Sequence, residues 1–213
     1  MIRFAPSIRA LAVCLAFLAG WVDALGFLAT SGFFVSFMSG NSTRLAVGLT
    51  GAYADAMAAG TLIFCFVAGV ILGAVAGAYG GRRHSAAVLL LVSLLLTGAA
   101  MASGWQGLWT PGLLALAMGA ENAVFEREGE APLGVTYMTG SLVRVGLGLS
   151  GILTGRRHPG WAGYAILWMG LVAGALAGAS LFPILKQDAM VLASVAAFAL
   201  AGWAWTAGLR ASS

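Results

Sequence analysis

Two stretches of this chain, 35–51 and 135–151, carry the same pattern of polar and small residues. The first reads VSFMSGNSTRLAVGLTG and the second, 100 residues later, reads VTYMTGSLVRVGLGLSG. Each copy places an arginine, Arg44 or Arg144, beside small hydroxyl residues in otherwise apolar surroundings. A duplicated charged motif in so apolar a chain is typical of transporters and channels, which build their sites from internal repeats.

The two arginines are the strongest candidates for chemistry. An arginine inside a bilayer costs several kcal/mol unless it is paired or hydrated. We expect Arg44 and Arg144 to flank a central pathway, where they bind an anionic group or gate an ion. The alternative is that each arginine locks its segment to a neighbouring helix through a salt bridge, and the two roles are compatible.

Asp23 and Glu121 are the expected partners of the arginines, since both acids lie in the apolar segment that precedes each motif. Asp23 is in register with Asn122, and Glu121 lies beside it. Burial favours the neutral form of a carboxyl group, whereas a neighbouring arginine favours its charged form. The balance allows either a proton-coupling site or a static ion pair.

The residues ahead of each arginine are typical of a helix start. Stretches 38–43 (MSGNST) and 138–141 (MTGS) contain good capping residues and a glycine that allows an unwound turn. A helix N-terminus offers free N–H groups and a partial positive charge to an anion. We therefore predict a binding site for a small polar or anionic solute, formed by Asp23, Asn41, Ser42, Arg44, Glu121, Asn122, Ser141 and Arg144.

The composition is that of a membrane protein. Hydrophobic residues make up 61% of the chain and charged residues only 8%, and the mean hydropathy is +0.95. No polar interval is long enough for a soluble domain, so residues 1–213 form one membrane domain. The net charge of +4 comes from basic residues at segment ends, which are topology anchors and not a nucleic-acid surface. Without zinc spacing, nucleophile elbow or phosphate loop, we expect no enzyme, metal or cofactor.

Each half of the chain, 8–104 and 111–209, contains four apolar segments in the same order. The first, third and fourth segments of each half read as spanning helices, in line with the roughly 20 residues a bilayer requires. The second segment is too polar for lipid, so we expect a re-entrant or broken helix inside the bundle, or one surrounded by protein. The segments are 8–29, 33–51, 57–80 and 86–104, then 111–125, 134–153, 161–183 and 189–209.

The basic residues favour six membrane crossings. If the second segments do not span, eight flanking basic residues lie inside and only Lys186 lies outside, as the positive-inside rule requires. Eight crossings would divide them five to four. Six crossings make the two halves inverted, so the two re-entrant segments enter from opposite faces and meet near the midplane. We expect a bacterial inner-membrane protein with both termini in the cytoplasm.

Glycines recur at every fourth position of the third segments, at Gly69, Gly73 and Gly77 and again at Gly170, Gly174 and Gly178. Such rows let helix backbones approach closely. We expect them to pack against another helix of the chain, and a homodimer through these faces is the alternative. His84 and His158 follow Arg-Arg pairs and are expected in solvated loops.

The motifs GWVDALGF (20–27), FVSFMSGN (34–41), GAENA (119–123) and TYMTGS (136–141) resemble those of a known family. The family is that of the YoaK-like bacterial inner-membrane proteins, the domain of unknown function 1275. The resemblance covers residues 8–185 and implies a small polytopic membrane protein, usually drawn with six helices. It implies no substrate. At Glu121 the family more often has glutamine, so this chain carries an additional charge there.

These observations predict an all-α polytopic membrane protein with about six transmembrane helices and two short re-entrant or buried helices. We expect solute transport by alternating movement of its halves around a midplane site. Two alternatives remain: a passive channel with the same residues as its filter, and a scaffold or assembly protein whose buried charges only stabilise the fold. The expected partners are the lipid bilayer and the solute, and nucleic acid is not among them.

Overall fold

The computed structural model describes residues 4–30, 32–102, 107–126, 138–156 and 159–208, and the elements in them are all helical. The predicted all-α class is therefore confirmed for this part of the chain. The helices are α1 (Pro6–Ala29), α2 (Met38–Gly48), α3 (Tyr53–Gly80), η1 (Gly81–Arg83), α4 (His84–Met101), α5 (Trp109–Glu121), η3 (Asn122–Phe125), α6 (Met138–Thr154), α7 (Trp161–Leu185) and α8 (Asp188–Thr206).

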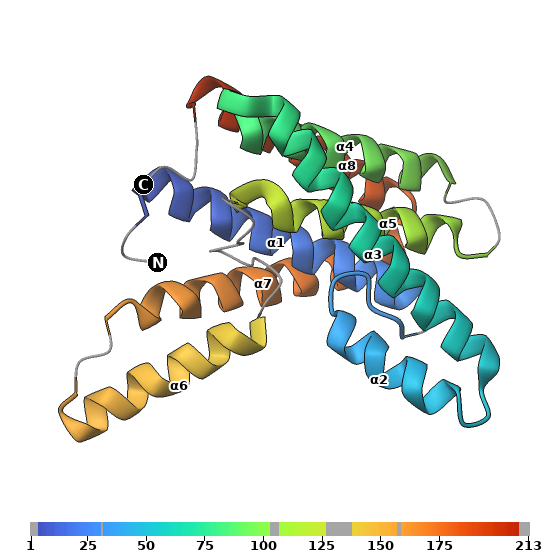
Figure 1. Cartoon of the computed structure of the whole chain (residues 1–213), viewed down its shortest axis with the longest axis horizontal. Helices are drawn as coiled ribbons and strands as arrows, with labels where there is room; N and C mark the ends of the chain where they lie inside the picture. Colours follow the sequence, from blue (N-terminus) through green and yellow to red (C-terminus); the bar gives the residue numbers. More distant parts are fainter. Residues whose placement is uncertain (1–3, 31, 103–106, 127–137, 157–158, 209–213) are drawn as a thin grey trace.

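Four stretches of the described chain are long and apolar enough to cross a membrane. They are Pro6–Ala29, Tyr53–Met101, Trp161–Leu185 and Asp188–Thr206. The second contains both α3 and α4, which fold back on each other at η1 (Figure 1). The turn begins at Gly81, whose φ of +49° is a conformation that L side chains rarely adopt.

Helices from opposite halves of the chain pack in pairs. α1 lies along α7, α3 along α5, and α4 along α8. α2 forms a hairpin with α3, and α6 forms a hairpin with α7. These hairpins lie at opposite ends of the molecule, and the N-terminal ends of α2 and α6 both point to its middle (Figure 1).

Glycines make the closest helix pairs possible. Gly69 and Gly73 of α3 lie against α5, and Gly174 and Gly178 of α7 lie against α1. A Cβ atom at any of these positions would collide with the facing backbone, because the helices touch there without intervening side chains. The glycine faces are covered within the chain, so a homodimer through them, the alternative from the sequence, lacks its surface. The facing residues are Leu116, Ala120, Phe17 and Trp21.

The short helices α2 and α6 are not surrounded by protein, and that part of our expectation is wrong. Val47 is 64% exposed and Leu153 is 87% exposed, because each helix packs only along its hairpin partner. Ser42 and Thr43 need no surrounding protein, since their hydroxyl groups bond within their own helix. The Ser42 hydroxyl donates to the Met38 carbonyl at 2.8 Å, one turn earlier, and Thr43 does the same to Ser39.

The expectation that His84 lies in a solvated loop is also wrong, whereas His158 lies outside the described residues. His84 is partly buried at the start of α4, with Nε2 2.7 Å from the Ala123 carbonyl oxygen. The neighbouring Ser85 hydroxyl donates to the Val124 carbonyl at 2.9 Å. These side chains pair with carbonyl groups of η3 at the end of α5, where backbone acceptors lack helical partners.

Candidate functional site

A central cavity of about 480 Å³ lies where the N-terminal ends of α2 and α6 face each other. The approach to α2 and the first turns of both helices supply most of its lining, and α3 supplies one aromatic wall from the middle of its length. The lining residues are Ser36, Phe37, Met38, Ser39, Phe66, Met138, Thr139 and Gly140. The two copies of the sequence motif therefore converge on one space.

The start of α2 lies at this central cavity. Its N-cap residue is Phe37, which makes no side-chain cap to the helix. The N–H groups of Met38 and Gly40 already donate to the carbonyl groups of Ser36 and Phe37, so the helix start contributes mainly the positive end of its dipole. The Ser36 hydroxyl is buried beside the Asp23 carboxyl group, at the lining of the cavity. Such an arrangement favours a ligand with acceptor atoms.

Asp23 organises the chain at the edge of the cavity. Its Oδ1 atom accepts hydrogen bonds from the backbone N–H groups of Val35 at 2.9 Å and Ser36 at 2.8 Å. The carboxylate is buried, and these two donors hold the segment that leads into α2. Asp23 thus lies behind the cavity-lining Ser36 and determines where that residue sits.

Arg44 and Arg144 contact aromatic rings and not the predicted acids. The guanidinium carbon of Arg44 lies 4.7 Å from the centre of the Phe33 ring, and that of Arg144 lies 4.8 Å from the centre of the Tyr164 ring. The predicted pairing with Asp23 and Glu121 is not formed among the described residues, so it was wrong. The Asp23 carboxyl group accepts backbone hydrogen bonds in place of an arginine. The planar guanidinium groups stack on aromatic faces, which stabilises them without an acid.

Glu121 and Asn122 lie at the end of α5 and are not among the described residues that line the central cavity. Glu121 is fully buried, and neither carboxyl oxygen has a hydrogen-bond partner within the described residues. The Asn122 amide donates to the Met118 carbonyl at 2.9 Å. Both residues face the helix bundle, where α3 and α4 pack on α5 and η3.

The remaining predicted residues lie in the first turns of α2 and α6. Asn41 is buried, and its amide both accepts from the Phe34 N–H at 3.1 Å and donates to the Phe34 carbonyl at 2.6 Å, so it orders the loop before α2. Ser42 is bonded within α2. Ser141 is buried directly after the cavity-lining Gly140.

Sequence reasoning did not place Ser36, Ser39, Thr139 and Phe66 in the site. A signal for two of them was present, because Ser39 and Thr139 are equivalent hydroxyl residues in the two motifs. Phe66 lies in a different segment, and only the packing of α3 brings it to the cavity.

Comparisons with known proteins agree with this architecture. Residues 11–203 match the family described as a protein of unknown function, DUF1275. The chain is 40% identical over 191 residues to a UPF0700 transmembrane protein of Rhizobium meliloti (strain 1021), which covers 90% of this chain and 83% of the relative. No solved structure matches the chain. With the family match extending over most of its length, this multi-pass transmembrane protein belongs to the DUF1275 family.

Proposed function

We propose that this protein is a secondary transporter of a small polar or anionic solute, which binds in the central cavity between α2 and α6. The observation that carries the proposal is the convergence of two helix N-termini on one cavity, with the hydroxyl residues Ser39 and Thr139 in its lining. In an apolar protein such groups require a polar ligand or water as partner.

The cavity suits a small solute with acceptor oxygens. Its volume of about 480 Å³ lies in the usual range of small-molecule sites, about 300–1,000 Å³. Ser39 and Thr139 stand at equivalent positions on the two helices, so their hydroxyl groups are available from both sides. The positive ends of two helix dipoles favour negative charge between them.

Asp23 supplies a means of proton coupling. Its carboxylate lies next to Ser36, and a negative charge there opposes an anionic solute in the cavity. Protonation of Asp23 would remove that repulsion while its carbonyl oxygen could still accept the two backbone hydrogen bonds. We therefore expect the solute and a proton to move together.

The arginines are assigned to the two routes into the cavity. Arg44 lies further along α2 and Arg144 further along α6, and these helices extend from the middle towards opposite ends of the molecule (Figure 1). Each guanidinium group stacks on a ring and keeps its charge for an approaching anion. The role in attracting the solute is independent of the salt bridges expected from the sequence.

Packing supports two inverted halves. Gly69 and Gly73 meet α5 as Gly174 and Gly178 meet α1, and the second pair lies 105 residues after the first. The α2–α3 hairpin corresponds in the same way to the α6–α7 hairpin. An inverted repeat supports transport, since rocking of one half against the other exposes a central site to each side in turn.

For the membrane we propose six crossings, by α1, α3, α4, α5 with η3, α7 and α8, in a bacterial inner membrane with both termini inside. The helix α5 is short, with 13 residues, but it is buried between α3, α4 and α1 and need not match the full lipid thickness.

The test begins with ligand binding to the purified protein. Small oxyanions, carboxylates, amino acids and sugars are screened by thermal shift, with wild type beside Ser36→Ala and Ser42→Ala. A ligand at one hundred times its Kd stabilises the folded form by about 2.7 kcal/mol. We expect the shift to disappear in Ser36→Ala and to persist in Ser42→Ala, because only Ser36 lines the cavity.

Flux in proteoliposomes then separates the alternatives. We expect saturable, proton-driven uptake with counterflow, reduced at least about tenfold by Arg44→Gln or Arg144→Gln, which corresponds to about 1.4 kcal/mol. Linear flux without counterflow would establish a channel. If no solute binds and both arginine variants only lower stability, the protein is a scaffold and the proposal is wrong.

A further inference from the structure

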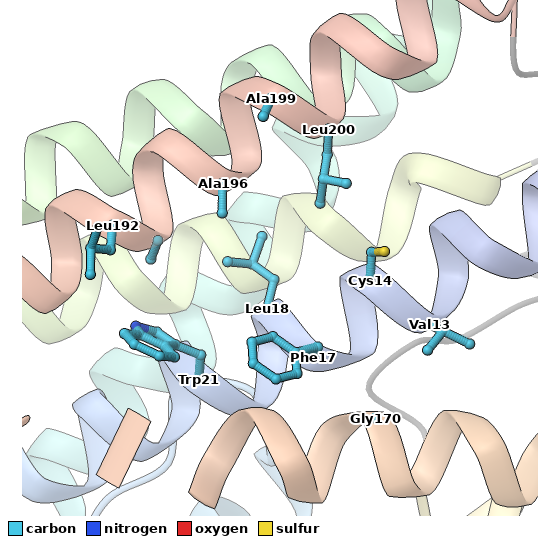
Figure 2. A pocket seen from close by; sticks show the side chains of 11 residues that line it. Val13, Cys14, Phe17, Leu18, Trp21, Gly170, Leu192, Ala196, Ala199 and Leu200 are labelled. Carbon is cyan, nitrogen blue, oxygen red and sulfur yellow. The ribbon is translucent and has the colours of Figure 1, made fainter. Parts of the chain in front are cut away.

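A second hollow lies on the outer surface of the bundle, away from the central cavity. It is a groove of about 560 Å³ between α1, α7 and α8 (Figure 2). Side chains of α1 and α8 face each other across it, and Gly170 of α7 closes its floor. We call it the outer groove, and its lining is Val13, Cys14, Phe17, Leu18, Trp21, Gly170, Leu192, Ala193, Ala196, Ala199 and Leu200.

The outer groove exists because α8 stands off from α1 and α7. In the other half α4 packs closely on both α3 and α5, whereas α8 meets α1 and α7 over much less of its surface. Ala193, Ala196 and Ala199 line the groove from α8 and carry only methyl side chains. At one end the Trp21 indole N–H donates to the Ala189 carbonyl at 3.0 Å and holds α8 at this spacing.

The chemistry of the lining specifies an apolar occupant. Within the described part of the chain no charged side chain lines the outer groove, and the helices around it are membrane-spanning candidates. Water in such a space would lack hydrogen-bond partners, so hydrocarbon must fill it.

The width of the outer groove favours an acyl chain over a helix as its occupant. Its α1 lining runs from Val13 to Trp21, about 12 Å along the helix axis. The helices α1 and α8 contact each other and are joined by the Trp21–Ala189 hydrogen bond, so the space between them is narrower than a helix, which is about 10 Å wide. A single acyl chain is narrower and flexible, so it can follow the space.

A cation stands at one end of the outer groove. Arg9 lies one helical turn before Val13 on the same face of α1, and it is exposed. At the end of a spanning helix an arginine reaches the level of lipid phosphates and pairs with them well. We propose that the outer groove binds one phospholipid, with an acyl chain between α1 and α8 and its phosphate at Arg9.

The test counts lipids on protein reconstituted in vesicles of phosphatidylethanolamine and phosphatidylglycerol. The protein is extracted in mild detergent, and retained phospholipids are counted by native mass spectrometry. We expect one retained phospholipid per wild-type chain and at least about tenfold less in Ala196→Phe, which fills the groove. Ala173→Phe is the matched control, because Ala173 is exposed on α7 outside the groove.

Two further variants keep the test decisive. Ala199→Phe fills the groove at a second point, should Ala196→Phe fold poorly, and Arg9→Gln should retain less phosphatidylglycerol with the protein still folded. Equal retention in wild type and both filled variants would overturn the proposal. So would the absence of retained lipid together with oxidative cross-linking of Cys14 between chains, which would assign the groove to a second copy.

Discussion

At the scale of single residues, Asp23 and the two arginines contact backbone groups and aromatic rings, where the sequence predicted salt bridges. Asp23 accepts two backbone N–H groups, whereas Arg44 stacks on Phe33. A buried carboxylate needs donors, and two well-directed amides satisfy it without a cation. Asp23 thereby holds the loop before α2 whether or not the arginine is present.

This reading predicts different effects of two substitutions at Asp23. Asp23→Ala removes both hydrogen bonds and should lower the free energy of unfolding by about 3 kcal/mol. Asp23→Asn keeps an oxygen that can accept both hydrogen bonds, so its loss should be about 1 kcal/mol. Unfolding in detergent micelles, followed by circular dichroism, measures both.

Two outcomes would contradict this role of the Asp23 hydrogen bonds. Wild-type stability in Asp23→Ala would mean that the two hydrogen bonds contribute nothing, and equal losses in both variants would mean that the charge itself is essential to the fold. Under the proposed function, Asp23→Asn should in addition abolish proton-driven uptake and leave solute binding intact.

At the scale of elements, the turns that follow α3 and α7 have the same backbone geometry. Gly81 ends α3 with φ +49° and ψ −114°, and Lys186 ends α7 with φ +46° and ψ −112°. The two positions are 105 residues apart, the same offset as the glycine contacts with α5 and α1. The sequence motifs had paired Gly69 with Gly170, 101 residues later, so the packing register differs by one helical turn.

Lys186 occupies a backbone conformation suited to glycine, and this predicts a stabilising substitution. Positive φ costs an L-residue roughly 1–2 kcal/mol, so Lys186→Gly should raise the free energy of unfolding by about 1 kcal/mol. Thermal unfolding of the purified protein checks the gain.

The adjacent position supplies the control. Gln187 has ordinary helical angles and is exposed, so Gln187→Gly should lower stability by about 0.5–1 kcal/mol. Lys186→Gln removes the charge alone and should leave stability unchanged. A loss of stability in Lys186→Gly would contradict the turn geometry.

At the scale of the whole molecule, the chain brings the starts of its two short polar helices together in the middle. α2 and α6 approach the middle from opposite ends (Figure 1), and their first turns enclose the central cavity. Neither helix needs to cross the bilayer for this arrangement, since each returns through a hairpin to α3 or α7. The proposed six-crossing topology is compatible with that geometry and with the positive-inside rule.

Cysteine labelling distinguishes six crossings from eight. In a Cys14→Ala, Cys65→Ala chain, Asp55→Cys before α3 and Arg82→Cys after it are treated on intact cells with an impermeant maleimide. We expect Asp55→Cys to be labelled directly and Arg82→Cys only after permeabilisation, because six crossings place α3 from outside to inside. The reverse pattern would require α2 to span, and labelling on one side only would mean that α3 does not cross.

The sequence by itself determined the helical membrane class, the polar motifs and the family. Composition and residue periodicity act over neighbouring positions, so they indicate where apolar helices lie and where a helix such as α2 starts. The two motifs of the sequence also predicted that two helix starts contribute to one site. The central cavity lies between those two helix starts.

Only the tertiary structure decided which groups meet. The pairing of α1 with α7, the rings beneath Arg44 and Arg144, the burial of Glu121 and the outer groove depend on contacts between distant parts of the chain or on packing around a side chain. A one-turn change of register between two glycine-faced helices leaves the sequence pattern the same and exchanges every facing residue. Residue spacing therefore predicts where the segments lie, and packing determines which segments are in contact.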